Sequence, residues 1–359
     1  MDINRLLESY QSRVEERSPK LEQFFSGTRP FIVVQRPQTN ELWRDCNSVD
    51  YVVENNLKAM GRILDFDFTD ELPYMEPWVG VGVYANAFGC EYLWRAGEAP
   101  ATHYKYMTLE EVENIEYPDY RQSPIMRMVI DIIDEMNEKT GGNIPISLTD
   151  TQSPFDTATL IVDASNFMIG CYETPEIACR FLNQITDLII EFSDVQLKHI
   201  GNMAAKPGHI MASCANGRGI SLSDDNLSFC AAEFNEQFAL PFNQRIGEKF
   251  GGVAIHSCGN WAHTMPSLRK FDQVFMLDCA LSSDCDPQPC LPGQVRDAVK
   301  GSGIIMKARV GNNPEKTISM LEQIADPGVQ LIVEIGYSEE KAEQNYLAVN
   351  NKLEELYGM

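Results

Sequence analysis

The stretch at residues 251–261, GGVAIHSCGNW, joins a short apolar run to two strong metal-binding side chains. The apolar residues 252–255 are followed by His256 and Cys258, which are separated by one residue. In a β-strand, residues i and i+2 point to the same face, so an imidazole and a thiol would project side by side from the strand end. The stretch therefore predicts a short buried strand that ends either in a metal site or in two ordinary polar side chains.

Similar apolar runs recur along the chain, and each is followed by turn residues and a longer segment with helical periodicity. The clearest helix opens at Thr174 and Pro175 and keeps an apolar stripe up to Gly201. A second helix is expected to start after Asp225. The predicted strands lie at residues 79–84, 144–148, 209–213, 252–255, 273–277, 304–308 and 330–333, with an eighth at residues 31–34.

This alternation of strands and helices predicts an α/β fold with a mostly parallel sheet. The near-repeating spacing favours a closed (β/α)8 barrel of the TIM type over an open doubly wound sheet. The chain also has neither a Gly-x-Gly-x-x-Gly motif after a first strand nor a P-loop. We expect a mainly helical N-terminal extension over residues 1–75, and a barrel that carries the active site over residues 76–359.

The composition excludes several classes of partner. The chain has 359 residues and a formal net charge of −23, so it repels phosphate backbones and anionic lipid headgroups. No apolar run approaches the roughly 18–20 residues that a membrane span requires, and residues 1–25 have the pattern of an acidic amphipathic helix rather than of a signal peptide. We therefore expect a cytoplasmic protein that binds neither nucleic acid nor membrane, and whose ten cysteines are reduced.

The active sites of (β/α)8 barrels lie at the carboxyl ends of the strands, so the residues that end each run form the candidate site. A purely structural barrel does not need polar and thiol side chains clustered there. These side chains are Asn86, Asp150, Cys214 with Asn216, His256 with Cys258, Asp278 with Cys279, Arg309, and Glu334 with Tyr337.

Zinc is the metal that the central pair favours, because thiolate and neutral imidazole are good zinc ligands. A catalytic zinc site usually has three protein ligands and one open position. His256 and Cys258 supply two of the three. The third ligand is either Cys279, at the end of the next strand, or Glu334, on the last strand.

Other polar residues have two interpretations each. Arg309 either holds a carboxylate or phosphate of a ligand in a bidentate contact or forms a salt bridge to Asp278. His209 and His263 are either acid–base groups or structural hydrogen bonders, and residues 224–225 are interpreted as a helix-capping pair of aspartates. The candidate catalytic residues are Arg309, Asp150 and Tyr337, and the candidate cofactor contacts are Asn216 and Asn260.

The chain contains, in this order, the segments IPISLTDTQSPFDTATLI (144–161), TPEIACRFLNQITDLI (174–189), ISLSDDNLSFCAAEFNEQFALPF (220–242) and HSCGN (256–260), followed by IVEIGYSEEKAEQN (332–345). The first four together resemble the uroporphyrinogen decarboxylase superfamily, and the last is a weaker match. The resemblance covers residues 75–359 and implies a (β/α)8 barrel. It also implies one of two chemistries: metal-free decarboxylation of uroporphyrinogen, or zinc-dependent transfer of methyl groups between corrinoid proteins and thiol acceptors.

The pair His256 and Cys258 is similar to the zinc-binding His-x-Cys pair of the methyltransferase branch. That branch has a distal cysteine in the region where this chain has Tyr337, so the resemblance implies that Glu334, Tyr337 or Cys279 takes its place. The decarboxylases have a histidine in that region and an arginine-rich N-terminal motif, and this chain has neither. The methyltransferase branch is therefore the closer resemblance.

We therefore expect a zinc-dependent methyltransferase that moves a methyl group between a corrinoid protein and a thiol-type acceptor. The resemblance implies Zn²⁺, a corrinoid supplied by the partner protein, a small thiol and a homodimer. Two alternatives are a metal-independent uroporphyrinogen decarboxylase-like enzyme and a non-catalytic barrel that binds a corrinoid or another tetrapyrrole.

Overall fold

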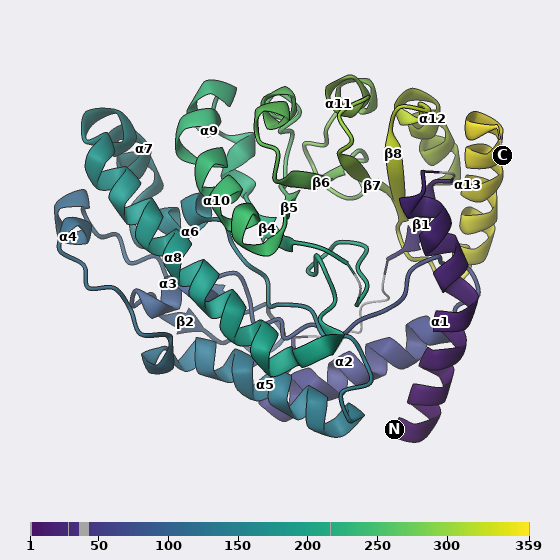
Figure 1. Ribbon diagram of the computed structural model, residues 1–359, viewed down its shortest axis with the longest axis horizontal. Helices are drawn as coiled ribbons and strands as arrows, with labels where there is room; N and C mark the ends of the chain where they lie inside the picture. The colour runs from purple at the N-terminus through teal and green to yellow at the C-terminus, as the bar shows by residue number, and fades with distance from the viewer. Residues whose placement is uncertain (1, 28, 36–42, 216, 359) are drawn as a thin grey trace.

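Six parallel strands form the central sheet of the computed structural model, which describes residues 2–27, 29–35, 43–215 and 217–358. Helices follow most of these strands and cover the outside of the sheet (Figure 1). In the order in which they are hydrogen-bonded, the strands are β1 (Phe31–Val34), β8 (Gln330–Ile335), β7 (Ile305–Gly311), β6 (Val274–Ala280), β5 (Val253–His256) and β4 (Ile220–Ser223).

Isolated backbone contacts lead from one edge of this sheet round to the other. They run from β1 through the segments around Met75, Ile146 and Ala204 and back to β4. The predicted α/β class and the TIM-type barrel are therefore confirmed, with irregular segments in place of some of the regular strands. The contacts are Asp70 N to Ile32 O, the parallel bridges Met75–Ile146 and Ile146–Ala204, and Ser221 N to Pro207 O.

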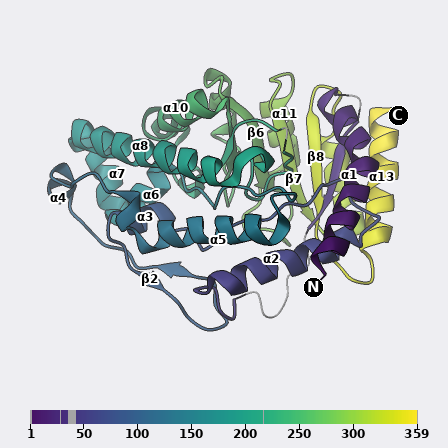
Figure 2. The ribbon, with the colours of Figure 1, turned by 60° about the horizontal axis from the view of Figure 1, so that its bottom comes forward.

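The helices form an outer layer, and the expected N-terminal helix is present, although β1 within residues 1–75 belongs to the barrel sheet. The first helix, α1, lies beside the last, α13, in both views of the ribbon (Figures 1 and 2), and Lys20 of α1 donates to the Tyr346 hydroxyl of α13. After β4, the helices are α9 (Ala232–Phe238), α10 (Leu240–Phe250), α11 (Pro292–Val299), α12 (Pro314–Ile324) and α13 (Ala342–Tyr357). Before it, they are α1 (Ile3–Phe25), α2 (Val49–Leu64), α3 (Val83–Ala87), α4 (Leu109–Glu113), α5 (Pro124–Thr140), α6 (Pro154–Ile161), α7 (Ala164–Glu173) and α8 (Pro175–Ile200).

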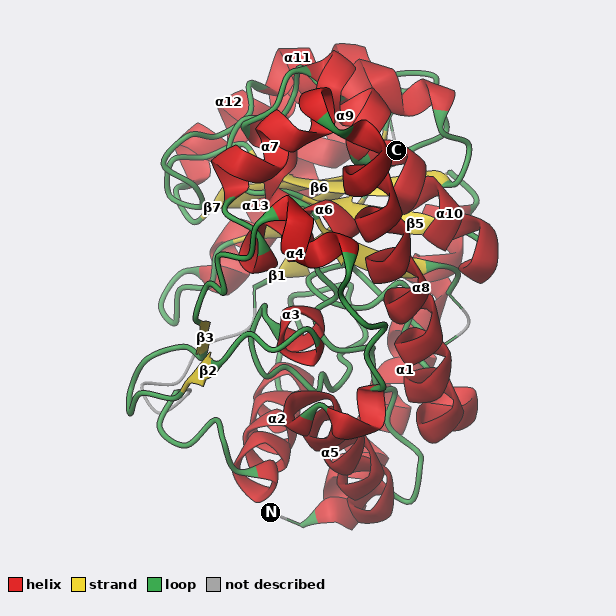
Figure 3. Cartoon of the chain, turned by 90° about the vertical axis from the view of Figure 1, so that its left-hand side faces the viewer, coloured by secondary structure: helices red, strands yellow, loops and turns green. Residues whose placement is uncertain are grey.

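Short elements complete the described chain. The antiparallel pair β2 (Tyr92–Leu93) and β3 (Ala101–Thr102) lies apart from the main sheet (Figure 3). Single 3₁₀ turns are η1 (Tyr120–Gln122), η2 (Gly201–Met203), η3 (Asp225–Ser228) and η4 (Met265–Lys270). The turn η3 and helix α9 replace the single helix that the sequence predicted after Asp225.

The strand predictions were right where the apolar run is short and uninterrupted. Strands β1, β5, β6, β7 and β8 lie where they were expected. Residues 79–84 instead form a turn that leads into α3, and Gly80 adopts a φ of +102° that a strand cannot hold. Residues 209–213 form part of the hairpin 206–214, and residues 144–148 contribute only the bridges of Ile146. Strand β4 was not predicted because two serines interrupt its apolar pattern.

The two-residue alternation of the strands divides their side chains between the barrel interior and the helical layer. Met211 and Ala212 of the hairpin fill the interior together with inward strand residues, which include Phe31, Ala254, Met276, Ile305 and Ile332. The alternate residues pack in the larger outer core, and they include Ile255, Leu277, Met306 and Val333. Two positions beyond the inward apolar residues, the same face carries His256, Asp278, Lys307 and Glu334. The apolar interior therefore ends in a polar ring.

A buried carboxylate joins the N-terminal extension to the barrel. Asp70 accepts hydrogen bonds from Ile32 N of β1 at 3.0 Å and from the Tyr346 hydroxyl of α13 at 2.8 Å. It also pairs with Lys20 of α1 at 2.8 Å and with Arg29 at 3.1 Å. One side chain thus holds α1, β1 and α13 together.

Replacement of Asp70 by alanine is expected to lower the free energy of unfolding by about 3 kcal/mol, because it leaves buried donors and two cations without their acceptor. Urea unfolding followed by circular dichroism measures the change. The matched control is Asp67→Ala. The Asp67 side chain is 81% exposed and forms an ion pair with Arg13. That control is expected to change stability by less than about 0.5 kcal/mol, and equal effects of the two variants would contradict the role given to Asp70.

Candidate metal centre at the barrel mouth

His256, Cys258 and Asp225 bring a nitrogen, a sulfur and an oxygen together at the polar end of the barrel. Their ligand atoms lie within 4.8 Å of one another. Nε2 of His256 lies 3.5 Å from Sγ of Cys258 and 3.9 Å from Oδ1 of Asp225. Among the residues that the structure describes, no other trio of histidine, cysteine or acidic side chains meets this condition. Imidazole, thiolate and carboxylate are the three ligand types that zinc takes in proteins, so the donor set fits this metal.

The His256 ring is oriented by a carboxylate. Its Nδ1 lies 2.7 Å from Oδ1 of Asp278, which is fully buried on the neighbouring strand. We assign the ring proton to Nδ1, because an ionised carboxylate only accepts hydrogen bonds. Nε2 then presents its lone pair towards Cys258 and Asp225. A carboxylate behind the histidine is the usual support of a metal-binding imidazole.

Two buried cations keep Asp278 ionised. Burial by itself raises the pKa of a carboxyl group, but Lys307 and Arg309 hold the pKa of Asp278 well below its usual range. Nζ of Lys307 lies 2.8 Å from Asp278 Oδ2 and 2.5 Å from Oε2 of Glu334. The two acids and the two cations balance one another inside the barrel, which is the condition for burying charges at tolerable cost.

Arg309 pairs with Asp278 and still has hydrogen-bond donors that could bind a ligand. Its Nε lies 3.0 Å from Asp278 Oδ1, but the geometry is not that of a hydrogen bond. Its Nη2 has no hydrogen-bond partner among the described residues. The predicted salt bridge between Arg309 and Asp278 therefore exists, and the guanidinium still has unused donors.

Asp225 joins the cluster through contacts that are distant in sequence. It opens η3, directly after β4, and the carboxylate of Asp156 in α6 accepts hydrogen bonds from Asp225 N at 2.6 Å and Asn226 N at 3.0 Å. Oδ1 of Asp225 in turn accepts from Cys258 N at 2.7 Å. The interpretation of residues 224–225 as a helix-capping pair was wrong: Asp224 occupies the N-cap position of η3, but its side chain accepts from Asn243 at 2.7 Å, and the Asp225 side chain accepts from Cys258 N.

The turn that carries Cys258 is held from two sides. Gly259 N donates to Asp286 Oδ2 at 2.8 Å, and Gly259 has a φ of +71° that favours glycine. Burial, followed by the charge of Asp225, raises the pKa of Cys258 to about 12. The thiol therefore needs a cation at the cluster to become the thiolate that binds a metal.

The structure does not bring Cys279 to the cluster. Because side chains alternate along β6, Asp278 points into the barrel and Cys279 points outward into the core beneath the helices. There it lies near Cys290, which raises its pKa well above the ordinary value for a thiol. Glu334 does face the barrel mouth, but it is paired with Lys307 rather than grouped with His256.

The remaining predicted site residues lie outside the cluster. Tyr337 stacks on Phe66, with ring centroids 5.5 Å apart and planes 10° apart. Asn260 lines a separate hollow with His263, and its Oδ1 accepts from Ala262 N at 3.3 Å. Asn216 lies outside the described residues. Cys214 lines another cavity, and Asn86 accepts from Ser123, so neither is part of the centre.

A cavity of about 400 Å³ opens beside the ends of β1, β7 and β8. Its lining includes Trp43, Trp78, His209, Arg309 and Glu334. This volume is within the range of small-molecule sites. Since Arg309 also contacts Asp278, the partner of His256, the cavity and the metal cluster share one wall.

His209 enters this cavity from the hairpin 206–214 as a paired cation. Its Nδ1 lies 2.6 Å from Glu76 Oε1, and its Nε2 lies 3.6 Å from Asp150 Oδ1. Burial lowers the pKa of this imidazole, but Asp150 and Glu76 more than offset the effect and raise it to about 9. The next residue, Ile210, has a φ of +56°, which is costly for a β-branched side chain. The predicted catalytic residue Asp150 therefore influences the charge of the cavity through its ion pair with His209.

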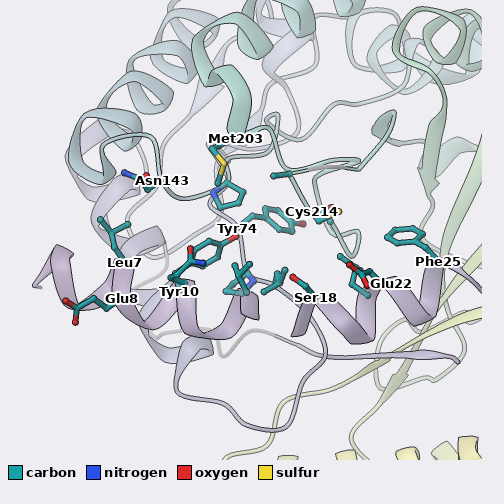
Figure 4. Close-up of a pocket in the computed structure, with 18 of the residues that line it drawn as sticks. Leu7, Glu8, Tyr10, Ser18, Glu22, Phe25, Tyr74, Asn143, Met203 and Cys214 are labelled. Atoms are coloured by element: carbon teal, nitrogen blue, oxygen red, sulfur yellow. The ribbon is translucent and has the colours of Figure 1, made fainter. Parts of the chain in front are cut away.

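A larger cavity of about 1140 Å³ lies elsewhere, along α1 (Figure 4). Leu7, Tyr10 and Phe25 of α1 line one side, and Met203 and Cys214 line the other. None of the three cluster residues lines either cavity, but the smaller one is lined by Arg309, which contacts Asp278 behind His256, and the larger one has no such residue. The larger volume therefore does not identify the candidate site.

Comparison with known proteins agrees with the fold and with the sequence motifs. The family model described as uroporphyrinogen decarboxylase (URO-D) matches residues 79–206. Among solved structures, a methyltransferase from Methanosarcina mazei superposes with a TM-score of 0.64 and 15% sequence identity, over 92% of this chain and 94% of that chain. No curated protein matches the chain. The predicted resemblance to the uroporphyrinogen decarboxylase superfamily is confirmed over residues 79–206, and the likeness to the methyltransferase shows a shared fold.

In the described part of the chain, no helix combines the length and the apolar character that crossing a membrane requires.

The charge state of His209 gives a pH dependence. Because its folded pKa of about 9 lies above the ordinary value of 6.5, the charged form stabilises the fold by about 3 kcal/mol below pH 6.5. This stabilisation is expected to disappear as the pH rises through 9. Urea unfolding of the wild type and of His209→Gln between pH 6 and pH 9.5 measures it, and the difference between the two proteins is expected to shrink with rising pH. A difference that stays constant over this range would contradict the paired imidazolium.

Proposed function

We propose that this chain is a zinc-dependent methyltransferase that moves a methyl group between a corrinoid protein and a thiol-type acceptor. The observation that carries the proposal is the orientation of His256, whose Nδ1 is held by Asp278 while Nε2 faces Cys258 and Asp225. A structural histidine does not need a buried carboxylate behind it and two further metal ligands in front. The proposed ligands are therefore His256, Cys258 and Asp225.

This ligand set leaves a position for the acceptor. His256, Cys258 and Asp225 would hold the zinc through three protein ligands, and the bound metal would supply Lewis acidity that lowers the pKa of a thiol acceptor, so that its thiolate would be present at neutral pH. Asp225 supplies an oxygen ligand in place of the distal cysteine that the superfamily resemblance implies near Tyr337. The missing cysteine therefore does not argue against a metal.

The cavity beside the cluster has the size and the groups to orient a small acceptor. Its volume of about 400 Å³ suits a small thiol compound. Arg309 has an unpaired Nη2 and lies against Asp278, so it is placed to hold an acidic group of the acceptor while the thiol reaches the cluster. His209 keeps a positive charge on the same wall at neutral pH. The Trp43 and Trp78 rings, 5.0 Å apart, supply an apolar side.

The decarboxylase alternative has less support from this arrangement. A substrate with many carboxylates needs cations that are not already neutralised. Lys307 is paired with Asp278 and Glu334, and His209 is paired with Glu76. Arg309 alone does not balance a polyanion.

Metal content tests the proposed ligands directly. The purified wild type is expected to hold about one zinc per chain by elemental mass spectrometry, and His256→Ala, Cys258→Ala and Asp225→Ala are each expected to lose most of it. Thiol methylation with methylcobalamin is expected to fall by about 100-fold or more in the same variants, because the acceptor stays protonated.

The matched control is Cys279→Ala, which removes a thiol close in sequence but on the outer face of β6. It is expected to keep its zinc. If Cys279→Ala loses zinc and Asp225→Ala keeps it, the third ligand is Cys279 rather than Asp225. If Cys258→Ala keeps zinc, the proposed centre is contradicted.

A further inference from the structure

Two buried thiols lie next to the turn that carries Cys258. Cys279 stands on β6 with its side chain in the outer core, and Cys290 ends the segment 281–290 that follows β6. Their exposed fractions are 0% and 1%. Neither thiol belongs to the metal cluster, so the pair is available for chemistry that the cluster does not use.

The backbone brings the two thiols into contact. Cys290 N donates to Ala280 O at 2.9 Å, so the segment 281–290 returns alongside the end of β6. The thiol of Cys279 then donates a hydrogen bond to the sulfur of Cys290. A disulfide needs its two Cα atoms about 4.4–6.8 Å apart, a spacing that backbone hydrogen bonding between neighbouring segments provides. A bond between these two sulfurs can therefore form with little movement of β6.

Cys290 is the more nucleophilic thiol of the pair. The Cys279 thiol, and after it the backbone N–H groups of Trp261 and Ala262, lower the pKa of Cys290 against the opposing effect of burial. The hydrogen bond between the thiols, followed by burial, raises the pKa of Cys279 well above its ordinary value. One thiol therefore loses its proton more readily while its neighbour keeps one. An attacking and a resolving cysteine differ in the same way.

The sulfur of Cys290 also contacts the turn of the metal cluster. It lies 3.7 Å from Gly259 O, and Gly259 directly follows Cys258. The segment 281–290 holds the same glycine a second time, because Asp286 Oδ2 accepts from Gly259 N at 2.8 Å. A change in the position of the Cys290 sulfur therefore alters the support of Cys258.

Only a short surface segment covers the two thiols on this side. Residues 283–284 and 287–288 are exposed, and the segment 281–290 forms turns and bends rather than a helix or strand. Such a segment opens locally at lower free energy than the sheet beneath it. A small oxidant is therefore better suited to reach Cys290 than a bulky disulfide compound.

We propose that Cys279 and Cys290 are a redox-active dithiol that hydrogen peroxide oxidises to a disulfide. The Cys290 thiolate attacks a peroxide oxygen, so that an S–O bond forms, the O–O bond breaks and the released hydroxide takes up a proton to become water. The Cys279 sulfur then attacks the sulfenic acid, the S–S bond forms, the S–O bond breaks, and the second water carries the Cys279 proton away. Two thiols are oxidised and one peroxide is reduced to two waters. A dithiol reductant reverses the oxidation by thiol–disulfide exchange.

Oxidation is expected to loosen the metal centre. An S–S bond of about 2.05 Å is much shorter than a contact between two thiols, so the Cys290 sulfur moves towards Cys279 and away from Gly259 O. The N–H groups of Trp261 and Ala262 then lose a strong acceptor. This consequence rests on the proposed function, whereas the formation of the disulfide does not.

The disulfide is tested by peptide mass spectrometry of the native protein after treatment with hydrogen peroxide and alkylation of the remaining thiols. The wild type is expected to give a peptide pair joined through Cys279 and Cys290, which dithiothreitol separates. Cys258→Ala is expected to form the same bond, because the reaction does not involve that thiol. Cys279→Ala is expected to stop at the sulfenic acid of Cys290, which dimedone traps.

The matched control is a second group of buried thiols. Cys171 on α7 lies near Cys179 on α8, but burial raises the pKa of Cys171 to about 12 and also raises the pKa of Cys179. Because neither is readily ionised, these two cysteines are expected to oxidise at least about 10-fold more slowly than Cys279 and Cys290.

Zinc content tests the link to the cluster. At the peroxide dose that completes the disulfide, the wild type is expected to lose more than half of its zinc and to bind zinc again after reduction by dithiothreitol. Cys290→Ser forms no disulfide and is expected to keep its zinc at that dose. Direct oxidation of Cys258 would remove zinc equally from both proteins, so the comparison separates the two causes.

Two results would overturn the inference. The first is that Cys279 and Cys290 both stay reduced at a peroxide dose that oxidises Cys171 and Cys179, and the second is that both pairs oxidise at the same rate. Equal zinc loss in the wild type and in Cys290→Ser would overturn the link to the cluster. A wild type that binds no zinc before oxidation would instead overturn the proposed function, and the disulfide would still be decided by its own peptide pair.

Discussion

The ionised carboxylate of Asp278 is the constraint on which the rest of the site depends. It is buried inside the barrel, where a lone charge is too costly to keep, so Lys307 and Arg309 stand on the next strand to balance it. Its remaining acceptor capacity fixes the His256 ring. The charge balance of the interior therefore determines which nitrogen of His256 faces the cluster. The same constraint makes Lys307 a structural residue and leaves Arg309 with donors for a ligand.

The position of the cluster follows from the barrel geometry and from one long-range anchor. Strand alternation places His256 on the inner face, and the turn after β5 returns Cys258 towards it. Asp225 reaches the same point because the buried carboxylate of Asp156 binds the backbone of η3. The turn then continues to Phe229, whose side chain is exposed. Arg309 and His209 both line the cavity, and Arg309 also contacts Asp278, which holds His256.

Local patterns were enough to predict the parts of the fold and site that lie within single strands. The uninterrupted runs of β5 to β8 identified buried parallel strands, and the residues that end them identified His256, Cys258, Asp278 and Arg309. The pattern failed where glycines at residues 80 and 82 imitate strand alternation and where the serines of β4 conceal it. It also suggested Cys279, because sequence spacing places strand ends together without saying which face a side chain takes. Asp225 was missed as a candidate ligand because its anchor, Asp156, lies 69 residues away in the chain.

X-ray absorption at the zinc edge of the purified protein tests the central claim most directly, since it reports the atoms bound to the metal. The account predicts one sulfur ligand at about 2.3 Å, with nitrogen and oxygen ligands at about 2.0–2.2 Å, and a second sulfur when the thiol acceptor is added. Two or more protein sulfurs in the absence of acceptor would contradict the assignment of Asp225 as the third ligand. A protein that binds no zinc after reconstitution under reducing conditions would contradict the metal centre altogether.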